Sequence, residues 1–268
     1  MAITLLLVLS LIYVVAFVGG SYHIFGTDKV GQDVLYQALK SIRSGVFIGT
    51  LTTLIMLPFA LLLGIAAGYF LGWIDDVIQY VYTTLNAIPG VLLIAAAILM
   101  LYLYMDRHPQ EFDDLATRAD WRLLFLCAIL GITSWTGLCR LLRAETLKVK
   151  QLDYIRAAQV LGVGRLRIIV RHIMPNVMHI VFITIALDFS GLVLAEAVLS
   201  YVEIGVDPSM HSWGNMINSA RLEMAREPVV WWSLSASLLL MSTLVLCANL
   251  FADAVRNCFD PRTETSRQ

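Results

Sequence analysis

Long apolar runs recur along this chain, and they constrain its fold more than any other feature. A helix needs about 20 mostly apolar residues to cross the hydrocarbon core of a bilayer. Five runs have this length and a shorter one precedes them: residues 46–73, 77–104, 123–142, 177–199 and 229–251, after 3–18. With 59% hydrophobic and only 15% charged residues, the composition also differs from that of a soluble domain. We predict an all-α polytopic membrane protein with about six transmembrane helices.

The first run, residues 3–18, is short for a span, and a signal peptide is the alternative interpretation. No Lys or Arg precedes the run, and no small-residue cleavage site follows it. We therefore predict a retained span. The expected organisation is an N-terminal transmembrane helix and linker at 1–25, then a membrane domain at 26–268.

Several features between the first and fourth spans predict local structure. Residues 35–43 carry an apolar face opposite Lys40 and Arg43, which is typical of a helix on the membrane surface. Pro58 interrupts the second span, and Pro89-Gly90 should kink the third. Residues 106–122 form a polar island, for which we predict a solvated loop, with contact to a partner protein as the alternative.

The basic segment 154–176 lies between the fourth and fifth spans. Its positive residues are Arg156, Arg165, Arg167 and Arg171, with His172 beside them. Leu166, Ile169, Val170 and Ile173 follow the helical i, i+3, i+4, i+7 spacing and predict one apolar face. Gly162 and Gly164 allow a bend, and Pro175 should end the second helix. Two short helices meeting at a glycine hinge predict a docking element for another protein.

The distribution of positive charge predicts the orientation. The loop after the fourth span and the C-terminal tail hold most of the Lys and Arg, and two spans separate them. The positive-inside rule places both on the cytoplasmic side. Because the number of predicted spans is even, the N-terminus lies on the same side as the C-terminal tail. Lys29, Lys40 and Arg43 then fall outside, against this trend.

Sequence signatures of catalysis and of cofactor or metal binding are missing from the chain. It contains no GxxxxGK[ST] phosphate loop, HExxH or GxSxG, and its four cysteines have no metal-ligand spacing. We therefore expect neither enzymatic activity, nor a cofactor, nor a metal site. Any energy from nucleotide hydrolysis would have to come from a partner. A net charge of −1 gives no global basic field for nucleic acid.

Polar residues within the spans are candidates for a translocation pathway. An acid at bilayer depth costs about 2.5–3.5 kcal/mol on insertion scales unless it faces protein or water. Asp188 should face the bundle, either lining a path or making a structural ion pair or hydrogen bond. Asn86 beside Pro89 is either a kink device or a path residue, and Glu196 should reach interfacial water near a span end. Trp213 is expected to anchor at the interface, with contact to a binding protein as the alternative.

Three motifs resemble one known family. Arg156-Ala157-Ala158, Gly162 and Ile173-Met174-Pro175 resemble the cytoplasmic coupling loop of permease subunits from bacterial ATP-binding cassette importers, with Arg156 in place of an acid. Gly26-Thr27-Asp28 and Ser212–Met216 also resemble that family. The form with Tyr154 and Arg171-His172-Ile173 is similar to the second permease of the dipeptide, oligopeptide and nickel group.

This resemblance implies the type I importer permease fold with cytoplasmic coupling helices, in the bacterial inner membrane. It implies that residues 145–175 form a coupling loop in which Tyr154, Arg156, Ala157, Ala158, Gly162, Arg171 and Pro175 contact an ATPase. The implied partners are a second permease, two cytoplasmic ATP-binding subunits and an extracytoplasmic solute-binding protein, in addition to lipid. The implied function is alternating-access import of peptides or similar solutes; uptake of nickel or antimicrobial peptides stays open. An ion-coupled secondary transporter is the alternative from another class, supported by Asp188 alone.

Overall fold

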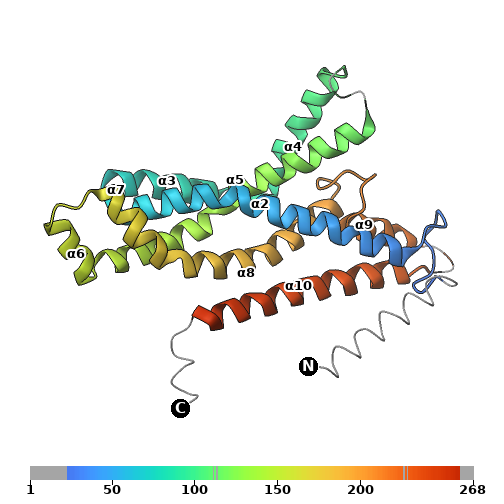
Figure 1. The fold of residues 1–268 in the computed structure, drawn as a ribbon. Helices are drawn as coiled ribbons and strands as arrows, with labels where there is room; N and C mark the ends of the chain where they lie inside the picture. The colour runs from blue at the N-terminus through green and yellow to red at the C-terminus, as the bar shows by residue number, and fades with distance from the viewer. Residues whose placement is uncertain (1–22, 111, 113, 226, 228, 260–268) are drawn as a thin grey trace, which may run out of the picture. The chain divides into compact units, whose positions relative to one another are not determined.

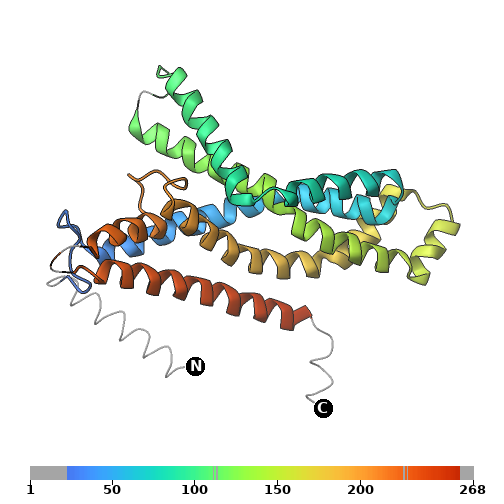
Figure 2. The ribbon, with the colours of Figure 1, turned by 180° about the vertical axis from the view of Figure 1, so that it is seen from behind.

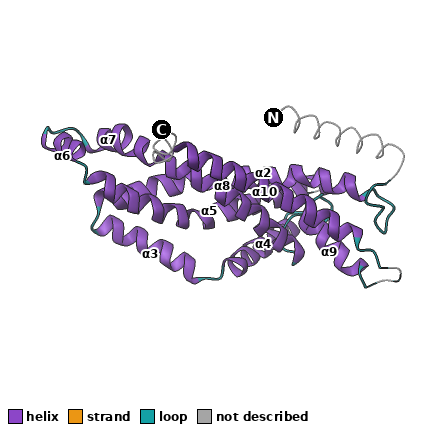
Figure 3. Cartoon of the chain, turned by 90° about the horizontal axis from the view of Figure 1, so that it is seen from below, coloured by secondary structure: helices purple, strands orange, loops and turns teal. Residues whose placement is uncertain are grey.

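The computed structural model describes residues 23–259 except 111, 113, 226 and 228, and this part contains helices and no strand (Figure 3). The predicted all-α fold is confirmed. The elements in chain order are α2 (Val34–Phe70), α3 (Trp73–Ala87), α4 (Gly90–Arg107), α5 (Leu115–Lys150), α6 (Asp153–Val160), α7 (Arg165–Ile168), the π turn η1 (Ile169–Ile173), α8 (Met174–Tyr201), α9 (Trp213–Glu223) and α10 (Trp232–Phe259).

Five helices in the described part are long and apolar enough to cross a membrane. They are α2, α4, α5, the continuous helix Arg165–Tyr201 and the segment Trp232–Cys258 of α10. These correspond to the last five of the six predicted spans. The first predicted span, residues 3–18, lies outside the described residues.

The start of α2 differs from the prediction. The expected surface helix at residues 35–43 is not separate but forms the first turns of α2, which continues through Pro58 to Phe70. Val34, Ala38, Ser41 and Ile48 are buried on one side of it. A proline inside a membrane helix is tolerated because neighbouring helices and local adjustments satisfy the freed carbonyl group. The predicted interruption at Pro58 is therefore wrong.

The region around Pro89 and the polar island also differ from expectation. Ile88 is extended, with φ −88° and ψ 128°, so the predicted kink is a complete break between α3 and α4. A residue before proline avoids the helical region for steric reasons. The predicted loop 106–122 is largely helical, because α4 reaches Arg107 and α5 begins at Leu115. Figure 2 shows α4 and the first part of α5 as an antiparallel pair.

The described chain forms two compact units. Unit 1 comprises the described part of residues 1–46 together with Glu196–Leu244, and unit 2 comprises Phe47–Ala195 and the described part of 245–268. Each of the helices α2, α8 and α10 is divided between the two units, with one section in each.

In unit 2, α2 and α5 approach closely where Gly64 and Gly68 form a GxxxG pair on α2. A Cβ at Gly64 would lie 2.8 Å from the Cys139 carbonyl oxygen, and one at Gly68 would lie 2.7 Å from that of Arg143. Small residues at this spacing let two membrane helices pack backbone to backbone. The buried side chains Ala60, Leu138 and Leu142 continue the same contact into the core of the unit.

In unit 1, Trp213 joins α9 to the first part of α2. Its side chain is 1% exposed, and the indole N–H donates a 3.0 Å hydrogen bond to the Ala38 carbonyl oxygen. Trp213 is thus a core residue, which contradicts the predicted interface anchor; its predicted contact with a binding protein stays a prediction. The sequence missed the reason, because it did not predict that residues 213–223 form a helix whose first residue turns inward.

The Gly-Thr-Asp segment also belongs to unit 1 and forms a tight loop before α2. Asp28 accepts hydrogen bonds from the N–H groups of Val30 and Gln32 and from the Gln37 side chain, at 2.8–2.9 Å. Burial raises the pKa of Asp28, but these hydrogen bonds outweigh burial and hold the pKa below its ordinary value. Trp232 donates to the Thr27 carbonyl oxygen at 2.9 Å and ties the loop to α10.

The α2–α5 contact is tested by Gly68→Ala. The new Cβ would lie 2.6 Å from the Thr146 Cβ and 2.7 Å from the Arg143 carbonyl oxygen. We expect a loss of about 1–3 kcal/mol, as for other overpacked sites. The control is Gly137→Ala in α5, where nothing lies within 4 Å. Thermal melting of the purified protein in detergent should fall for the first variant and not for the second; equal melting temperatures would contradict this packing.

Candidate functional site

The segment joining α5 to α8, residues 151–176, is called the elbow here. It lies at one end of unit 2, where Figure 1 shows α6 beyond the ends of the longer helices. Two residues separate the end of α5 at Lys150 from the start of α6 at Asp153. The Lys150 ammonium donates a 2.7 Å hydrogen bond to the Tyr69 carbonyl oxygen, near the end of α2. This bond satisfies a carbonyl group that the helix end leaves without an intrahelical partner.

A Schellman turn connects the two arms of the elbow. The Gly162 N–H donates to the Gln159 carbonyl oxygen and the Val163 N–H to that of Ala158, both at 3.1 Å. Gly162 has φ +74°, a conformation that L side chains rarely adopt. The predicted bend is confirmed, and the residue that requires glycine is Gly162; of the two predicted short helices only α6 is short, because the second continues into α8.

The second arm runs into α8 without a stop. Helix α7 passes through the π turn Ile169–Ile173, in which the Met174 N–H donates to the Ile169 carbonyl oxygen, and then into α8. Pro175 is the second residue of α8, so the prediction that it ends the helix is wrong. The wider π turn falls where the missing proline N–H would otherwise break the α-helical hydrogen-bond pattern.

The elbow is fixed to unit 2 by three isoleucines. Ile155, Ile168 and Ile173 are all 0% exposed and belong to the same hydrophobic core as Leu138 and Leu142 of α5. Burying such a side chain contributes about 1.5–3 kcal/mol relative to exposure. The elbow is therefore an extension of the core, and its position is coupled to the helices that it joins.

The opposite face of the elbow presents large apolar side chains to solvent. Val160 is 87% exposed, Leu161 81%, Leu166 75% and Val170 54%. The predicted apolar face of Leu166, Ile169, Val170 and Ile173 is thus split, because Leu166 and Val170 point outward. The sequence missed Ile168, which takes the inward position instead.

Of the coupling residues predicted from the sequence, Arg156, Ala157, Gly162, Arg171 and Pro175 are exposed and Ala158 is half-buried. Tyr154 is also exposed, and its hydroxyl accepts a 2.9 Å hydrogen bond from the Asn176 side chain at the start of α8. This bond joins the two ends of the elbow. Asn176 was within the predicted segment, but its role could not be inferred from spacing.

An ion pair missed by the sequence analysis supports the helices behind the elbow. Arg143 of α5 donates two hydrogen bonds of 2.6 Å to the two carboxylate oxygens of Asp75 in the first turn of α3. Asp75 is 5% exposed and Arg143 is half-buried, so the carboxylate of this bidentate pair is held away from solvent. Removing Arg143 would leave the buried carboxylate of Asp75 without its counter-ion.

The predicted pathway residues have different environments. Asn86 accepts a 3.1 Å hydrogen bond from the Thr136 hydroxyl of α5. Asp188 is half-buried and makes no hydrogen bond or ion pair within the described part of the chain. Glu196 is 1% exposed and accepts a 2.7 Å hydrogen bond from Ser200, so the predicted access to interfacial water is wrong.

Comparison with known proteins assigns the architecture to a family. Residues 60–265 match the family described as "Binding-protein-dependent transport system inner membrane component". The chain belongs to this family. It is therefore an inner-membrane transport component with the type I importer permease fold, as the coupling-loop motif predicted.

Similar proteins include three named transport permeases. The oligopeptide transport system permease protein of Mycobacterium tuberculosis is 31% identical over 249 residues, covering 93% of this chain and 79% of that protein. The glutathione transport system permease protein of Pectobacterium atrosepticum is 29% identical, covering 91% and 74%. The dipeptide transport system permease protein of Bacillus subtilis is 26% identical, covering 90% and 69%.

The hinge of this permease is tested by Gly162→Ala against Gly164→Ala. Both sites have open space for a Cβ, but only Gly162 has a positive φ, whereas Gly164 has φ −59°. A left-handed conformation costs an L residue about 1–2 kcal/mol, so Gly162→Ala should weaken the turn. We expect faster hydrogen–deuterium exchange of the Gly162 and Val163 amides in the first variant. Equal exchange in both variants would contradict a strained hinge.

Proposed function

We propose that this permease is one of two membrane subunits of an ATP-driven peptide importer, and that its elbow receives motion from a cytoplasmic ATPase subunit. The observation that carries the proposal is the two-sided elbow: three fully buried isoleucines face the core, while Val160, Leu161, Leu166 and Val170 face outward. A partner that binds the outer face would push on the core directly.

The charges around the elbow support a cytoplasmic position. Arg156, Arg165, Arg167 and Arg171 are exposed beside the apolar side chains. Basic loops are retained on the cytoplasmic side during insertion. We therefore place the elbow and both chain termini in the cytoplasm, and the segment between α8 and α10 outside.

A hollow beside the hinge supports docking of a protein partner. It has a volume of about 480 Å³ and is lined by Tyr69 and Phe70 at the end of α2, and by Gln159, Gly164 and Arg165 of the elbow, among others. Interfaces of this kind place aromatic and arginine side chains at their energetic centre. An ATPase side chain that enters the hollow would contact both α2 and the elbow.

The remaining partners and the cargo follow from the relatives. The named relatives serve oligopeptide, glutathione and dipeptide transport systems. We propose a peptide cargo, a second permease that shares the pathway, two ATP-binding subunits and an extracytoplasmic binding protein. Alternating access would arise when ATPase closure moves the elbow and the attached helices α5 and α8 re-orient.

The proposal is tested by Leu161→Asp in the complex reconstituted with its ATPase subunits and binding protein. Leu161 is 81% exposed and supports no core contact, so the charge should disrupt docking without unfolding the chain. We expect at least about tenfold less ATPase co-purification, since 1.4 kcal/mol is a factor of ten. Peptide-loaded binding protein should stimulate ATP hydrolysis in the wild-type complex and much less in this variant.

The matched control is Leu115→Asp at the start of α5, where the leucine is 79% exposed outside the elbow. Its co-purification and stimulation should equal those of the wild type. Equal losses in both variants, or uptake that follows an ion gradient without the ATPase subunits, would exclude the proposed coupling.

A pathway role for Asp188 is part of the proposal, because its carboxylate is half-buried in α8 and has no partner in the described part of the chain. Intramembrane acids of this kind face water-filled paths or partner subunits. Asp188→Asn should lower peptide uptake about tenfold while leaving ATPase co-purification intact. Asp106→Asn, an exposed carboxylate at the end of α4, is the control. Unchanged uptake in Asp188→Asn would remove this role.

A further inference from the structure

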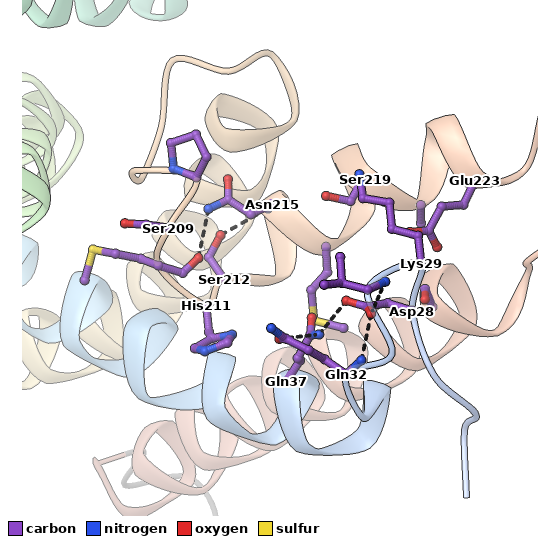
Figure 4. A pocket seen from close by; sticks show the side chains of 16 residues that line it. Asp28, Lys29, Gln32, Gln37, Ser209, His211, Ser212, Asn215, Ser219 and Glu223 are labelled. Atoms are coloured by element: carbon purple, nitrogen blue, oxygen red, sulfur yellow. Dashed lines mark hydrogen bonds between the residues drawn. The ribbon is translucent and has the colours of Figure 1, made fainter. Parts of the chain in front are cut away.

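A polar cavity in unit 1 contains a buried carboxylate oxygen that has no hydrogen-bond partner among the residues that the structure describes. The cavity has a volume of about 420 Å³ and lies between the Gly-Thr-Asp loop, the start of α2, α9 and the start of α10. Figure 4 shows Glu223, Ser219 and Lys29 on one side of the view, and Ser209, Ser212, Asn215 and His211 on the other.

The unpartnered groups are Glu223 and Ser233. Glu223 is 2% exposed and Ser233 5%, and both line the cavity. The Glu223 Oε2 and Ser233 Oγ atoms are buried and have no hydrogen-bond partner among the described residues. A buried carboxylate oxygen without a donor is costly, so the site favours a ligand that donates N–H groups.

The position of Glu223 strengthens this preference. It is the last residue of α9. The helix dipole makes the C-terminal end negative, and an acid there adds to that charge instead of offsetting it. A positively charged group at this point would offset both.

None of the other titratable groups around the cavity supplies the positive charge that Glu223 lacks or competes with Glu223 for a cationic ligand. Asp28 is already satisfied by three donors. Burial and the positive charge of Lys40 lower the pKa of His211, which favours its neutral form. Lys29 lines the cavity but makes no ion pair with Glu223. A metal ion is disfavoured, because the described residues contain no cluster of three His, Cys, Asp or Glu side chains.

We propose that this cavity accepts an Arg or Lys side chain of the extracytoplasmic binding protein, with Glu223 as its counter-ion and Ser233 as a second acceptor. This inference rests on the proposed function for the identity of the partner and for the side of the membrane. The exposed residues Lys29, Pro208, Ser209 and Ser219 border the cavity and leave it accessible. A family whose transport depends on a binding protein supplies the partner at this surface.

The test measures the Kd between the loaded binding protein and the whole complex in nanodiscs, at low and at physiological salt. Glu223→Gln should raise the Kd about tenfold or more, because it removes one partner of a desolvated charge pair. Ser233→Ala should give a smaller increase. Basal ATP hydrolysis should not change and the melting temperature should not fall, which separates lost contact from misfolding. The control Glu227→Gln alters an exposed carboxylate four residues away and should leave the Kd unchanged.

Two further variants test whether the ligand is positively charged and whether it comes from outside this chain. Lys29→Gln should leave the Kd unchanged or lower it, because it removes a competing positive charge. An increase like that of Glu223→Gln would indicate an anionic ligand and overturn the proposal. Arg226→Gln tests the nearest basic residue in the sequence after Glu223, and an equal loss there would assign the counter-ion to this chain.

The last variant pair exchanges the charges of Glu223 and its basic partner residue. Glu223→Lys should abolish tight binding, and replacing the contacting basic residue of the binding protein by Glu should restore it. No change in Kd for Glu223→Gln, with intact stimulation of ATP hydrolysis, would refute the cavity role and leave the proposed function standing. Absence of stimulation in the wild-type complex would instead refute the proposed function. A changed uptake KM for peptides with free amino termini, at constant Kd, would assign the cation to the cargo and overturn the proposal.

Discussion

The burial of Ile155, Ile168 and Ile173 in the core of unit 2 is the interaction on which the rest of the structure depends. Without it, residues 151–176 would be an exposed basic connection between two membrane helices. With it, the elbow moves only if α2, α5 and α8 adjust, because close-packed interiors transmit strain. The Lys150–Tyr69 and Asn176–Tyr154 hydrogen bonds fix the ends of the same segment. The elbow is therefore packed as part of the core of unit 2.

The membrane environment explains how the helices that carry the elbow are held together. Lipid offers no hydrophobic driving force between helices, so association depends on close packing and on satisfied polar groups. The Gly64–Gly68 pair supplies the close packing of α2 on α5. The bidentate Asp75–Arg143 pair then joins α3 to α5 next to that contact. Both features lie within unit 2 and support the helices from which the elbow extends.

Much of this architecture could be predicted from the sequence because the bilayer sets the length of each span. The apolar runs predicted five described spans, and the Ala-Ala and Gly162 pattern predicted a hinged pair of helices. The predictions were wrong where tertiary contacts accommodate a residue that a local rule disfavours. Pro58 and Pro175 are helix breakers in isolation, yet neighbouring helices and the π turn accommodate them. Trp213 seemed suited to an interface, but α9 turns it onto Ala38.

The sequence by itself determined that the chain lies in a membrane, where its spans fall and which loop carries the positive charge. These properties depend on composition over about 20 residues, because the thickness of the bilayer sets the length of an apolar span. Only the tertiary structure decided which side of each element faces the core. It turned Ile168 inward and Leu166 outward, paired Asp75 with Arg143, and buried Glu223 with its Oε2 atom unpaired among the described residues. Such choices depend on contacts between residues far apart in the chain, and no local pattern contains them.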